Sequence, residues 1–449
     1  MRSMRWTPAI LLVLSACASG ESRRESANGD TVDSTGAAKP TATATTPATT
    51  DGTATAATPG ASTVDFVAGA HLKDAPATVR ALYVNRWATQ SRTKMRHLID
   101  IADRTEINAL VLDLKDEFGL NFASRDSSVS KNAGRSGTIP NLSALIDTLH
   151  AHGIVAIARM VTFKDSVAAR VNPQHTIRKT DGSAWHDKQG LTWVDPYDPM
   201  IREYNIRVAE ELTRIGFDEI QFDYVRFPEP YPSLPQQVFP DAKGVSKPQA
   251  LADFLGAACK RINALGARCT ADIFGLVTTV RGPLEIGQEW EKISPVVDVV
   301  LPMTYPSHYP RGSFGLARPN AEPEAIQRIA NAKAHDRDIA LKIAKPEHVR
   351  PWIQAFTLGA PAYGPAEIDA QKRGVYAAGY DGWVLWSPGS KYDIFLPALE
   401  PTLVSRKRPY PPDGAATPAV ANSTPKAAAD STVDKLKVAA PTDSTKKPR

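Results

Sequence analysis

Four side chains in the middle of the sequence have the types and spacing that acid–base chemistry requires. They are Asp116, Asp223, Arg226 and Asp272, and each lies in or just after a short apolar run. Two neighbouring carboxyl groups cannot both ionise easily, so one keeps its proton while a cation such as Arg226 or Lys115 holds the other as a carboxylate. Such a pair can cleave a glycosidic bond. We predict that Asp223 and Asp272 are this catalytic pair, with Asp116 and Arg226 assisting.

A second group of polar and aromatic residues lies near the ends of the same runs, where it would contact a substrate. Aromatic rings pack against the C–H faces of sugars, and charged groups bond to their hydroxyls. Each residue also has a structural alternative, namely an ion pair for a charged group, core packing for a ring, or support of a neighbouring ring for the histidine. The predicted substrate-binding residues are Asp113, Lys115, Arg159, Trp193, Tyr224, Tyr305, His308, Trp352, Gln354 and Trp386.

The elements that must position these residues alternate between strand-length apolar runs and amphipathic helical patterns. This alternation is typical of parallel β/α units and predicts one (β/α)8 TIM barrel over residues 65–401. A doubly wound open sheet is the alternative, but no Gly-x-Gly-x-x-Gly follows the first strand. The seventh strand is ambiguous, because Ile339–Ile343 competes with Pro351–Phe356. The expected strands are Ala81–Val84, Ala109–Leu114, Val155–Met160, Glu219–Asp223, Thr270–Phe274, Val297–Pro302, Pro351–Phe356 and Trp383–Trp386.

Helical patterns separate these runs, and a long loop follows the third strand. Residues 162–199 exceed the usual length of a connector and contain Trp185, His186 and Trp193, so we expect a lid or substrate platform, with a packed buttress as the alternative. The expected helices are Lys94–Asp103, Leu142–Ala151, Met200–Arg214, Gln249–Leu265, Glu324–Ala334 and Ala366–Ala377. In such a barrel the site lies at the carboxyl ends of the strands, where Asp223 and Asp272 are expected.

Several motifs, taken in order, resemble the family of bacterial putative glycoside hydrolase domains. The resemblance covers residues 80–392 and implies a TIM barrel that acts on glycans. Two positions depart from the family, which often has an acid in place of Ala355 and Asn in place of Ser387. If that acid is catalytic in relatives, this chain lacks it. The matching segments are Lys164-Asp165, Gly190–Tyr197, Phe217–Pro228, Ala271–Gly275, Pro302–Tyr309, Arg350–Phe356 and Gly382–Trp386.

The first residues have the layout of an export signal that ends in a lipid attachment site. Residues 1–17 combine Arg2 and Arg5, an apolar run and the lipobox Leu14-Ser15-Ala16-Cys17, which predicts lipidation of Cys17. Residue Ala18 is not acidic, so the anchor would be in the outer membrane of a cell with two membranes. We therefore expect an exported bacterial lipoprotein of the cell envelope. Residues 18–64 are a low-complexity linker that we expect to be disordered.

The chain carries 53 Lys and Arg against 48 Asp and Glu, a net charge of +5. Residues 401–449 contribute nine Lys or Arg and four Asp, which accounts for the whole excess and leaves the first 400 residues neutral. This balance argues against a nucleic-acid-binding body. Residues 402–449 are expected to be a disordered basic tail. Cys259 and Cys269 are expected to be separate buried thiols, with a disulfide as the alternative.

These observations predict an envelope-anchored glycoside hydrolase. A catalytically inert carbohydrate-binding barrel would show the same aromatic residues but only paired acids, and a metal-dependent deacetylase is a third possibility. The sequence has no motif for a cofactor or a catalytic metal, so we expect neither. The expected partner is a glycan or polysaccharide, and the expected state is a monomer. The sugar and its linkage do not follow from the sequence.

Overall fold

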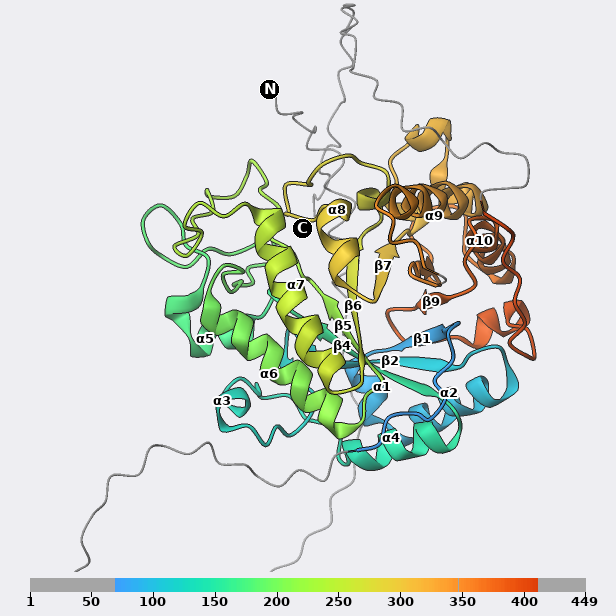
Figure 1. Ribbon diagram of the computed structural model, residues 1–449, viewed down its shortest axis with the longest axis horizontal. Helices are drawn as coiled ribbons and strands as arrows, with labels where there is room; N and C mark the ends of the chain where they lie inside the picture. Colours follow the sequence, from blue (N-terminus) through green and yellow to red (C-terminus); the bar gives the residue numbers. More distant parts are fainter. Residues whose placement is uncertain (1–68, 346, 411–449) are drawn as a thin grey trace, which may run out of the picture.

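The computed structural model describes residues 69–345 and 347–410, and these form a (β/α)8 barrel, as predicted (Figure 1). Eight parallel strands are bonded in the order β1-β9-β8-β7-β6-β5-β4-β2, and a β1–β2 pairing closes the ring. A short strand, β3, is antiparallel to β2. Residues 1–17, 18–64 and 411–449, including Cys17, lie outside the described part. No helix within that part is long and apolar enough to span a membrane.

All eight expected strands are present, two of them at the expected bounds and the others with shifts of one or two residues at their ends. β8 is at the expected place rather than at Ile339–Ile343, because α9 (Pro323–Ala340) continues into that segment. Only one residue of β8 pairs with β7, through Met303 and Trp352, but a bridge between Val300 and Val349 extends the contact. The strands are β1 Arg80–Val84, β2 Ala109–Asp116, β3 Gly119–Leu120, β4 Val155–Val161, β5 Glu219–Asp223, β6 Arg268–Phe274, β7 Val299–Met303, β8 Trp352–Gln354 and β9 Trp383–Trp386.

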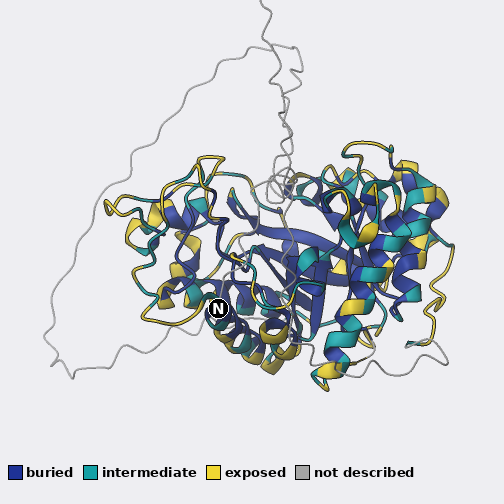
Figure 2. Ribbon diagram, turned by 90° about the horizontal axis from the view of Figure 1, so that it is seen from above, coloured by how far each residue is buried: buried dark blue, intermediate teal, exposed yellow. Residues whose placement is uncertain are grey.

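The expected helices surround the barrel, and their exposed faces point outward (Figure 2). Side-chain caps fix several starts, as where Asp198 accepts N–H bonds from Met200 and Ile201 at the start of α6. The α-helices are α1 Arg86–Gln90, α2 Arg92–Arg104, α3 Ser127–Ser130, α4 Leu142–Ala151, α5 Ser166–Val171, α6 Pro199–Ile215, α7 Lys247–Ala264, α8 Trp290–Ile293, α9 Pro323–Ala340 and α10 Pro365–Ala377. Short 3-10 helices are Pro173–His175, Gly275–Thr278, Ser294–Val296, Pro306–His308, Ser313–Gly315, Pro319–Ala321 and Asp393–Ala398.

Strand periodicity sorts side chains between two hydrophobic cores. In β5, Ile220 and Phe222 belong to the core between the strands and the helices, as expected. A smaller core inside the barrel contains alternate residues such as Val111 and Ile157. Gln221 and Asp223 share the inward face of β5, so this strand delivers its carboxylate to the end of the barrel interior.

An irregularity in β2 separates the three charged residues at its end. Asp113 is aligned with Arg159 of β4, and the register then shifts so that Lys115 is aligned with Met160. Met160 packs in the outer core, and Lys115 accordingly reaches Asp165 of the following loop, with 2.8 Å between Nζ and Oδ2. The shift leaves Asp113 and Asp116 both directed to the cavity described below.

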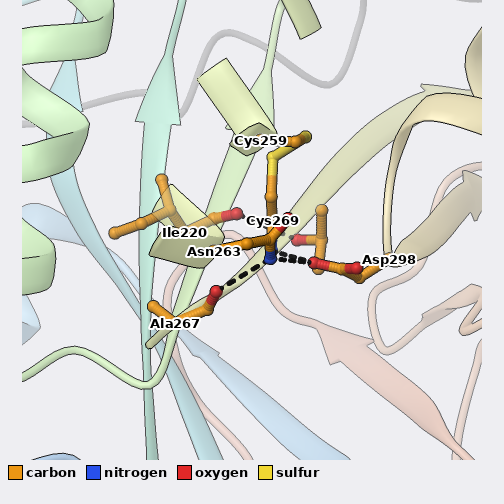
Figure 3. The surroundings of a disulfide bond; sticks show 7 residues. Ile220, Cys259, Asn263, Ala267, Cys269 and Asp298 are labelled. Atoms are coloured by element: carbon orange, nitrogen blue, oxygen red, sulfur yellow. Dashed lines mark hydrogen bonds between the residues drawn. A yellow bond between two sulfur atoms is a disulfide. The ribbon is translucent and has the colours of Figure 1, made fainter. Parts of the chain in front are cut away.

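Cys259 of α7 and Cys269 of β6 form a disulfide, so the expectation of two separate thiols was wrong (Figure 3). The pair is 10 residues apart in sequence, and the turn after α7 folds the chain back so that the two Cα atoms are 5.1 Å apart. Asp298 fixes this turn, because its Oδ2 accepts bonds from the Cys269 N–H at 2.8 Å and from Asn263 Nδ2 at 2.6 Å. The bond therefore ties α7 to the amino end of β6.

The folded unit extends past the expected boundary at residue 401. The carboxylate of Asp381 is buried at the amino end of the barrel, and the backbone N–H groups of Arg406 and Lys407 donate to it at 2.7 and 2.8 Å. Ser405 donates to the same carboxylate, and Tyr410 donates to Asp336. The tail expected from residue 402 thus begins as a bound strap, because a buried carboxylate needs donors that the barrel alone does not supply.

Candidate active site

A cavity of about 600 Å³ lies at the carboxyl ends of the strands, the face predicted to carry the site. Its lining contains four acids, four cations and nine aromatic rings. The acids are Asp113, Asp116, Glu117 and Asp223; the cations are Arg86, Arg159, Lys164 and Arg226; the rings are Tyr83, Trp87, Phe118, Tyr224, Phe274, Tyr305, His308, Trp352 and Trp386. Asp223 and Arg226, which both belong to the segment Phe217–Pro228, therefore reach this cavity.

Arg159 stands between two of the acids. Its Nη1 donates to Asp113 Oδ1 at 2.5 Å, while its Nε donates to Asp223 Oδ2 at 3.0 Å and its Nη2 contacts the same oxygen. The hydroxyl of Tyr83 donates to the other oxygen of Asp113 at 2.5 Å. Burial nonetheless raises the pKa of Asp113 to about 6, and the nearby charge of Asp116 adds to this increase. Asp113 thus has the ion pair that its structural alternative anticipated.

Asp223 accepts hydrogen bonds on both oxygens. Besides Arg159 on Oδ2, its Oδ1 accepts the N–H of Tyr224 at 2.6 Å. That short bond accompanies a left-handed backbone at Tyr224, whose φ is +48°. A non-glycine residue in this region is strained, and such strain is common where a side chain is fixed for function. Asp223 still lines the cavity, so a substrate can reach it.

Asp272 lies deeper than the cavity and does not line it. Its side chain is 1% exposed and accepts bonds from Gln221 Nε2 at 2.8 and 3.0 Å and from Trp352 Nε1 at 2.7 Å. Burial, followed by the negative charge of Asp223, raises the pKa of Asp272 well above its ordinary value. The two predicted partners thus influence each other electrostatically, but only Asp223 opens to the cavity.

The two predicted assisting residues are bound by other partners. Asp116 forms a two-pronged ion pair with Arg86, with Nε–Oδ2 and Nη2–Oδ1 distances of 2.7 and 2.8 Å. Arg226 pairs with Glu229 at 3.1 Å and lies over the rings of Trp193, Tyr224 and Phe274 at about 5 Å. The cation beside Asp223 is therefore Arg159, not Arg226 or Lys115.

Glu117 is a cavity acid that the sequence reasoning missed. It occupies the turn between β2 and β3, and in the described structure its carboxylate has no hydrogen bond to another residue and no ion pair. Burial and the adjacent Asp116 charge raise the pKa of Glu117. The signal was present in the sequence, since Glu117 directly follows Asp116 and precedes the Phe-Gly of a tight turn.

A family model described as "Putative glycosyl hydrolase domain" matches residues 81–392, which contain the whole barrel and every acid of the cavity. The chain belongs to this family. No curated protein matches the chain significantly. Among solved structures, a hypothetical protein from Ruminiclostridium thermocellum is 35% identical, covers 42% of this chain and 96% of its own, and has a TM-score of 0.39.

A second solved structure is similar over more of the chain. The glycoside hydrolase domain of PgaB (BpsB) from Bordetella bronchiseptica is 16% identical, covers 70% of this chain and 95% of its own, and has a TM-score of 0.51. At this identity the likeness concerns the fold. It agrees with the barrel described above.

Within this glycosyl hydrolase domain, most predicted substrate-binding residues meet in the cavity, and three do not. Lys115 is turned toward Asp165. Trp193 is buried and donates from Nε1 to Asp187 at 3.0 Å, and Gln354 accepts the Ser307 N–H at 3.1 Å behind the cavity wall. The predicted residues that line the cavity are Asp113, Arg159, Tyr224, Tyr305, His308, Trp352 and Trp386.

The rings of the cavity wall pack against one another. Tyr83 and Trp386 are stacked with centroids 4.0 Å apart, and Trp352 meets Trp386 edge to face at 5.3 Å. His308 lies 5.2 Å from Tyr305, and burial lowers the pKa of His308 to about 4, so its ring is neutral at pH 7. This wall offers flat apolar surface beside the carboxylates, as sugar binding requires.

The loop over residues 162–199 packs mainly as a buttress. Trp185 is fully buried and donates from Nε1 to the Pro235 carbonyl, and bridges such as Thr176–Val194 tie the loop to itself. At the cavity the loop contributes Lys164, whose Nζ donates to Gln189 Oε1 at 2.7 Å. Across residues 69–345 and 347–410, no cluster of three His, Cys, Asp or Glu side chains could hold a metal ion.

Proposed function

We propose that this protein hydrolyses glycosidic bonds in the cavity at the carboxyl end of the barrel. The observation that supports this most strongly is the contrast between two cavity carboxyl groups, Asp223 and Glu117. Arg159 bonds to Asp223, whereas in the described part of the chain Glu117 forms no ion pair, and burial raises its pKa against the smaller opposing effects of Arg159 and Lys164. Glycoside hydrolysis needs one ionised and one protonated carboxyl group on either side of the bond.

The chemistry assigns a role to each group. Asp223 attacks the anomeric carbon or activates a water, since its lone pairs are oriented by Arg159 and by the Tyr224 N–H. Glu117 protonates the leaving oxygen, because burial favours its neutral form. The wall rings support the flattened, positively charged sugar of the transition state. Asp272, the partner predicted from sequence, accepts the Trp352 Nε1–H and is placed to orient that ring.

One experiment separates the two candidate acids. Purified wild type is incubated with polysaccharide fractions from bacterial envelopes, and released reducing ends are measured and products are followed by NMR. Glu117→Gln abolishes turnover of poor leaving groups but spares activated aryl glycosides, because they leave without protonation. If Asp272→Asn shows this leaving-group dependence instead, the proton comes from Asp272. Glu324→Gln, at an exposed acid outside the cavity, is the control.

An inert carbohydrate-binding barrel is the second candidate function, and the ion pairs among the cavity acids support it. Asp113 and Asp223 share Arg159, and Asp116 is paired with Arg86. Glu117 is the exception, since a purely binding barrel has no need of a half-buried acid without an ion pair. Binding of a polysaccharide without any turnover would establish the inert function. This test is needed because the chain has Ala355 where the family often has an acid.

We propose that the barrel works at the cell envelope, anchored by lipid on Cys17 and held away from the surface by residues 18–64. The support is the sequence pattern alone, with its charged start, apolar run and lipobox. Cys17→Ser then releases the protein from membranes or blocks its processing. Membrane fractionation of both forms tests this, and unchanged membrane association of the variant contradicts it.

A further inference from the structure

Two exposed aromatic side chains stand at the rim of the cavity. Trp87 is 56% exposed and Phe118 is 44% exposed, and among the described residues no other Trp, Phe or Tyr is an exposed large hydrophobic group. Both belong to the cavity lining, and their ring centroids are 5.9 Å apart with planes inclined at 55°. The pair comes from two elements, α1 and the β2–β3 turn.

The backbone beneath these rings is fixed by one buried guanidinium. Arg86, 2% exposed, precedes Trp87 and donates to both oxygens of Asp116, to the Gly119 carbonyl at 2.5 Å and to the Gly137 carbonyl at 3.0 Å. Asp116 in turn accepts the N–H of Phe118 at 2.9 Å. Arg86 and Asp116 therefore hold together the backbone segments that carry Trp87 and Phe118.

The turn that carries Phe118 has little freedom to move. Gly119 has a φ of +98°, and a Cβ there would lie 2.6 Å from the Ala133 carbonyl oxygen. At the other ring, Asn85 caps α1 by accepting the Ala88 N–H and also donates to the Pro388 carbonyl. Rings held in place before binding lose little entropy when a ligand covers them, which is how preorganised sites gain affinity.

We propose that Trp87 and Phe118 form a sugar-binding subsite that stacks on a pyranose ring of a glycan chain leaving the cavity. This rests on the proposed function and deepens it. The ligand must offer an apolar face to the two rings while its other groups suit a cavity with four acids and four cations, and a carbohydrate has both properties. An acyl chain would satisfy the rings but not the charged interior.

The position of Phe118 links this subsite to catalysis. Phe118 follows Glu117 in the same turn, so a sugar stacked on it lies next to the unit whose bond Glu117 would protonate. A subsite outside the cleaved bond is useful only for a chain of several sugars. The substrate is therefore a polysaccharide or long oligosaccharide rather than a disaccharide.

Affinity electrophoresis of the full chain tests the subsite without requiring turnover. Native gels contain glycol chitin, hydroxyethyl cellulose, dextran, soluble starch or solubilised peptidoglycan, and the Asp223→Asn background prevents hydrolysis. In the gel that retards this form, adding Trp87→Ala and Phe118→Ala weakens binding at least about tenfold, whereas Trp87→Phe retains most of it. Met200→Ala is the matched control, since Met200 is also 56% exposed but lies outside the cavity lining.

Each result has a defined meaning. Equal retardation of the double alanine variant and its parent overturns the subsite, as does a dimer in sedimentation that Trp87→Ala dissociates, because the rings would then be an interface between copies. Retardation that depends on the rings, in a protein whose wild type releases no product, keeps the subsite and overturns the proposed hydrolysis. No retardation of any form in any gel overturns both. Thermal melting of each variant confirms that the fold is intact.

Discussion

Both ends of this barrel contain buried charges, but they use them differently. At the amino end, Glu219 bonds to Arg350, and Glu106 bonds to Arg80 and Lys372, so that acids and cations pair among themselves. At the carboxyl end, a cavity of about 600 Å³ opens among the charges, and Glu117 there forms no ion pair with any described residue. An end whose charges are fully paired serves stability, and an end with an unpaired acid beside a cavity can serve chemistry.

The pKa directions reinforce this contrast. Burial raises the pKa of Asp113, Glu117 and Asp272 around the cavity. Their neighbours supply too few donors to offset the loss of water. The comparison predicts that changes at the carboxyl end affect turnover and changes at the amino end affect the free energy of unfolding.

The largest expected effect is on turnover at the carboxyl end. Asp223→Asn lowers kcat by about 10²- to 10⁴-fold, because the amide neither attacks nor activates water, while Arg159 keeps its ion pair with Asp113, which limits the loss of stability. Initial rates of reducing-end release give the ratio, with Glu324→Gln as the control. Near-normal turnover would remove Asp223 from the mechanism, and Asp113 with Asp116 would be the next pair to test.

The corresponding change at the amino end is expected to leave turnover alone. Glu219→Gln removes the charge that faces Arg350, which is 1% exposed and bonded to Glu219 at 2.6 Å. An unpaired buried guanidinium destabilises a protein by about 3–5 kcal/mol. Urea denaturation measures this loss, and kcat of the folded fraction should equal that of wild type. A large drop in kcat without a loss of stability would break the comparison.

A pH-dependent effect is expected from Asp113. Its pKa is about 6 in the folded protein and about 3.9 in an unfolded chain. Between these values the folded state binds the proton more tightly, so this group makes unfolding progressively easier as the pH rises from about 4 to 6. The contribution is at most about 3 kcal/mol, and Asp113→Asn abolishes it. Unfolding curves of both proteins at pH 4.5 and 7 should show a difference that changes by about 2 kcal/mol, since part of the effect is already lost at pH 4.5; a constant difference would contradict the assignment.

The disulfide lies at the amino end of the barrel, so its loss should change the free energy of unfolding and not turnover. Closing a loop of about ten residues is worth about 2–3 kcal/mol in the chain-entropy account. Changing Cys259 and Cys269 together to Ala therefore lowers the free energy of unfolding by about this amount, with kcat unchanged. Oxidised and reduced wild type, compared in the same denaturant series, provide the check, and a change in kcat would show that β6 transmits strain to the cavity.

The fold followed from the sequence because its signals are periodic and local. Runs such as Glu219–Asp223 alternate apolar and polar residues, and each precedes a helical pattern with a capping residue such as Asp198. The barrel face of the site was equally predictable, since parallel strands bring their carboxyl ends together. Seven of the ten predicted substrate-binding residues indeed line the cavity.

The hydrogen-bonding partners of each acid could not be predicted from the sequence. They depend on how side chains from neighbouring strands pack together in three dimensions. Asp223 and Asp272 lie on adjacent strands, yet Gln221 and Trp352 enclose Asp272 below the cavity. The shift in β2 turned Lys115 away, and the β2–β3 turn brought Glu117 in. The disulfide was missed for a similar reason, since only the turn between α7 and β6 brings the two sulfur atoms together.

The smallest expected effect concerns the strap at the amino end. A chain ending at Tyr410 keeps the N–H bonds of Arg406 and Lys407 to Asp381, whereas a chain ending at Pro401 loses them and leaves a buried carboxylate with fewer donors. Each lost bond to a charged group is worth about 1.5–3 kcal/mol, but water enters the vacated surface and replaces part of it, so we expect about 1–2 kcal/mol in total. Thermal melting of the two truncations and of wild type measures this. The Tyr410 chain should melt with wild type and the Pro401 chain a few degrees lower, both with unchanged kcat. Because the strap contacts only the amino end, an altered kcat in the shorter chain would show that the two ends are not independent.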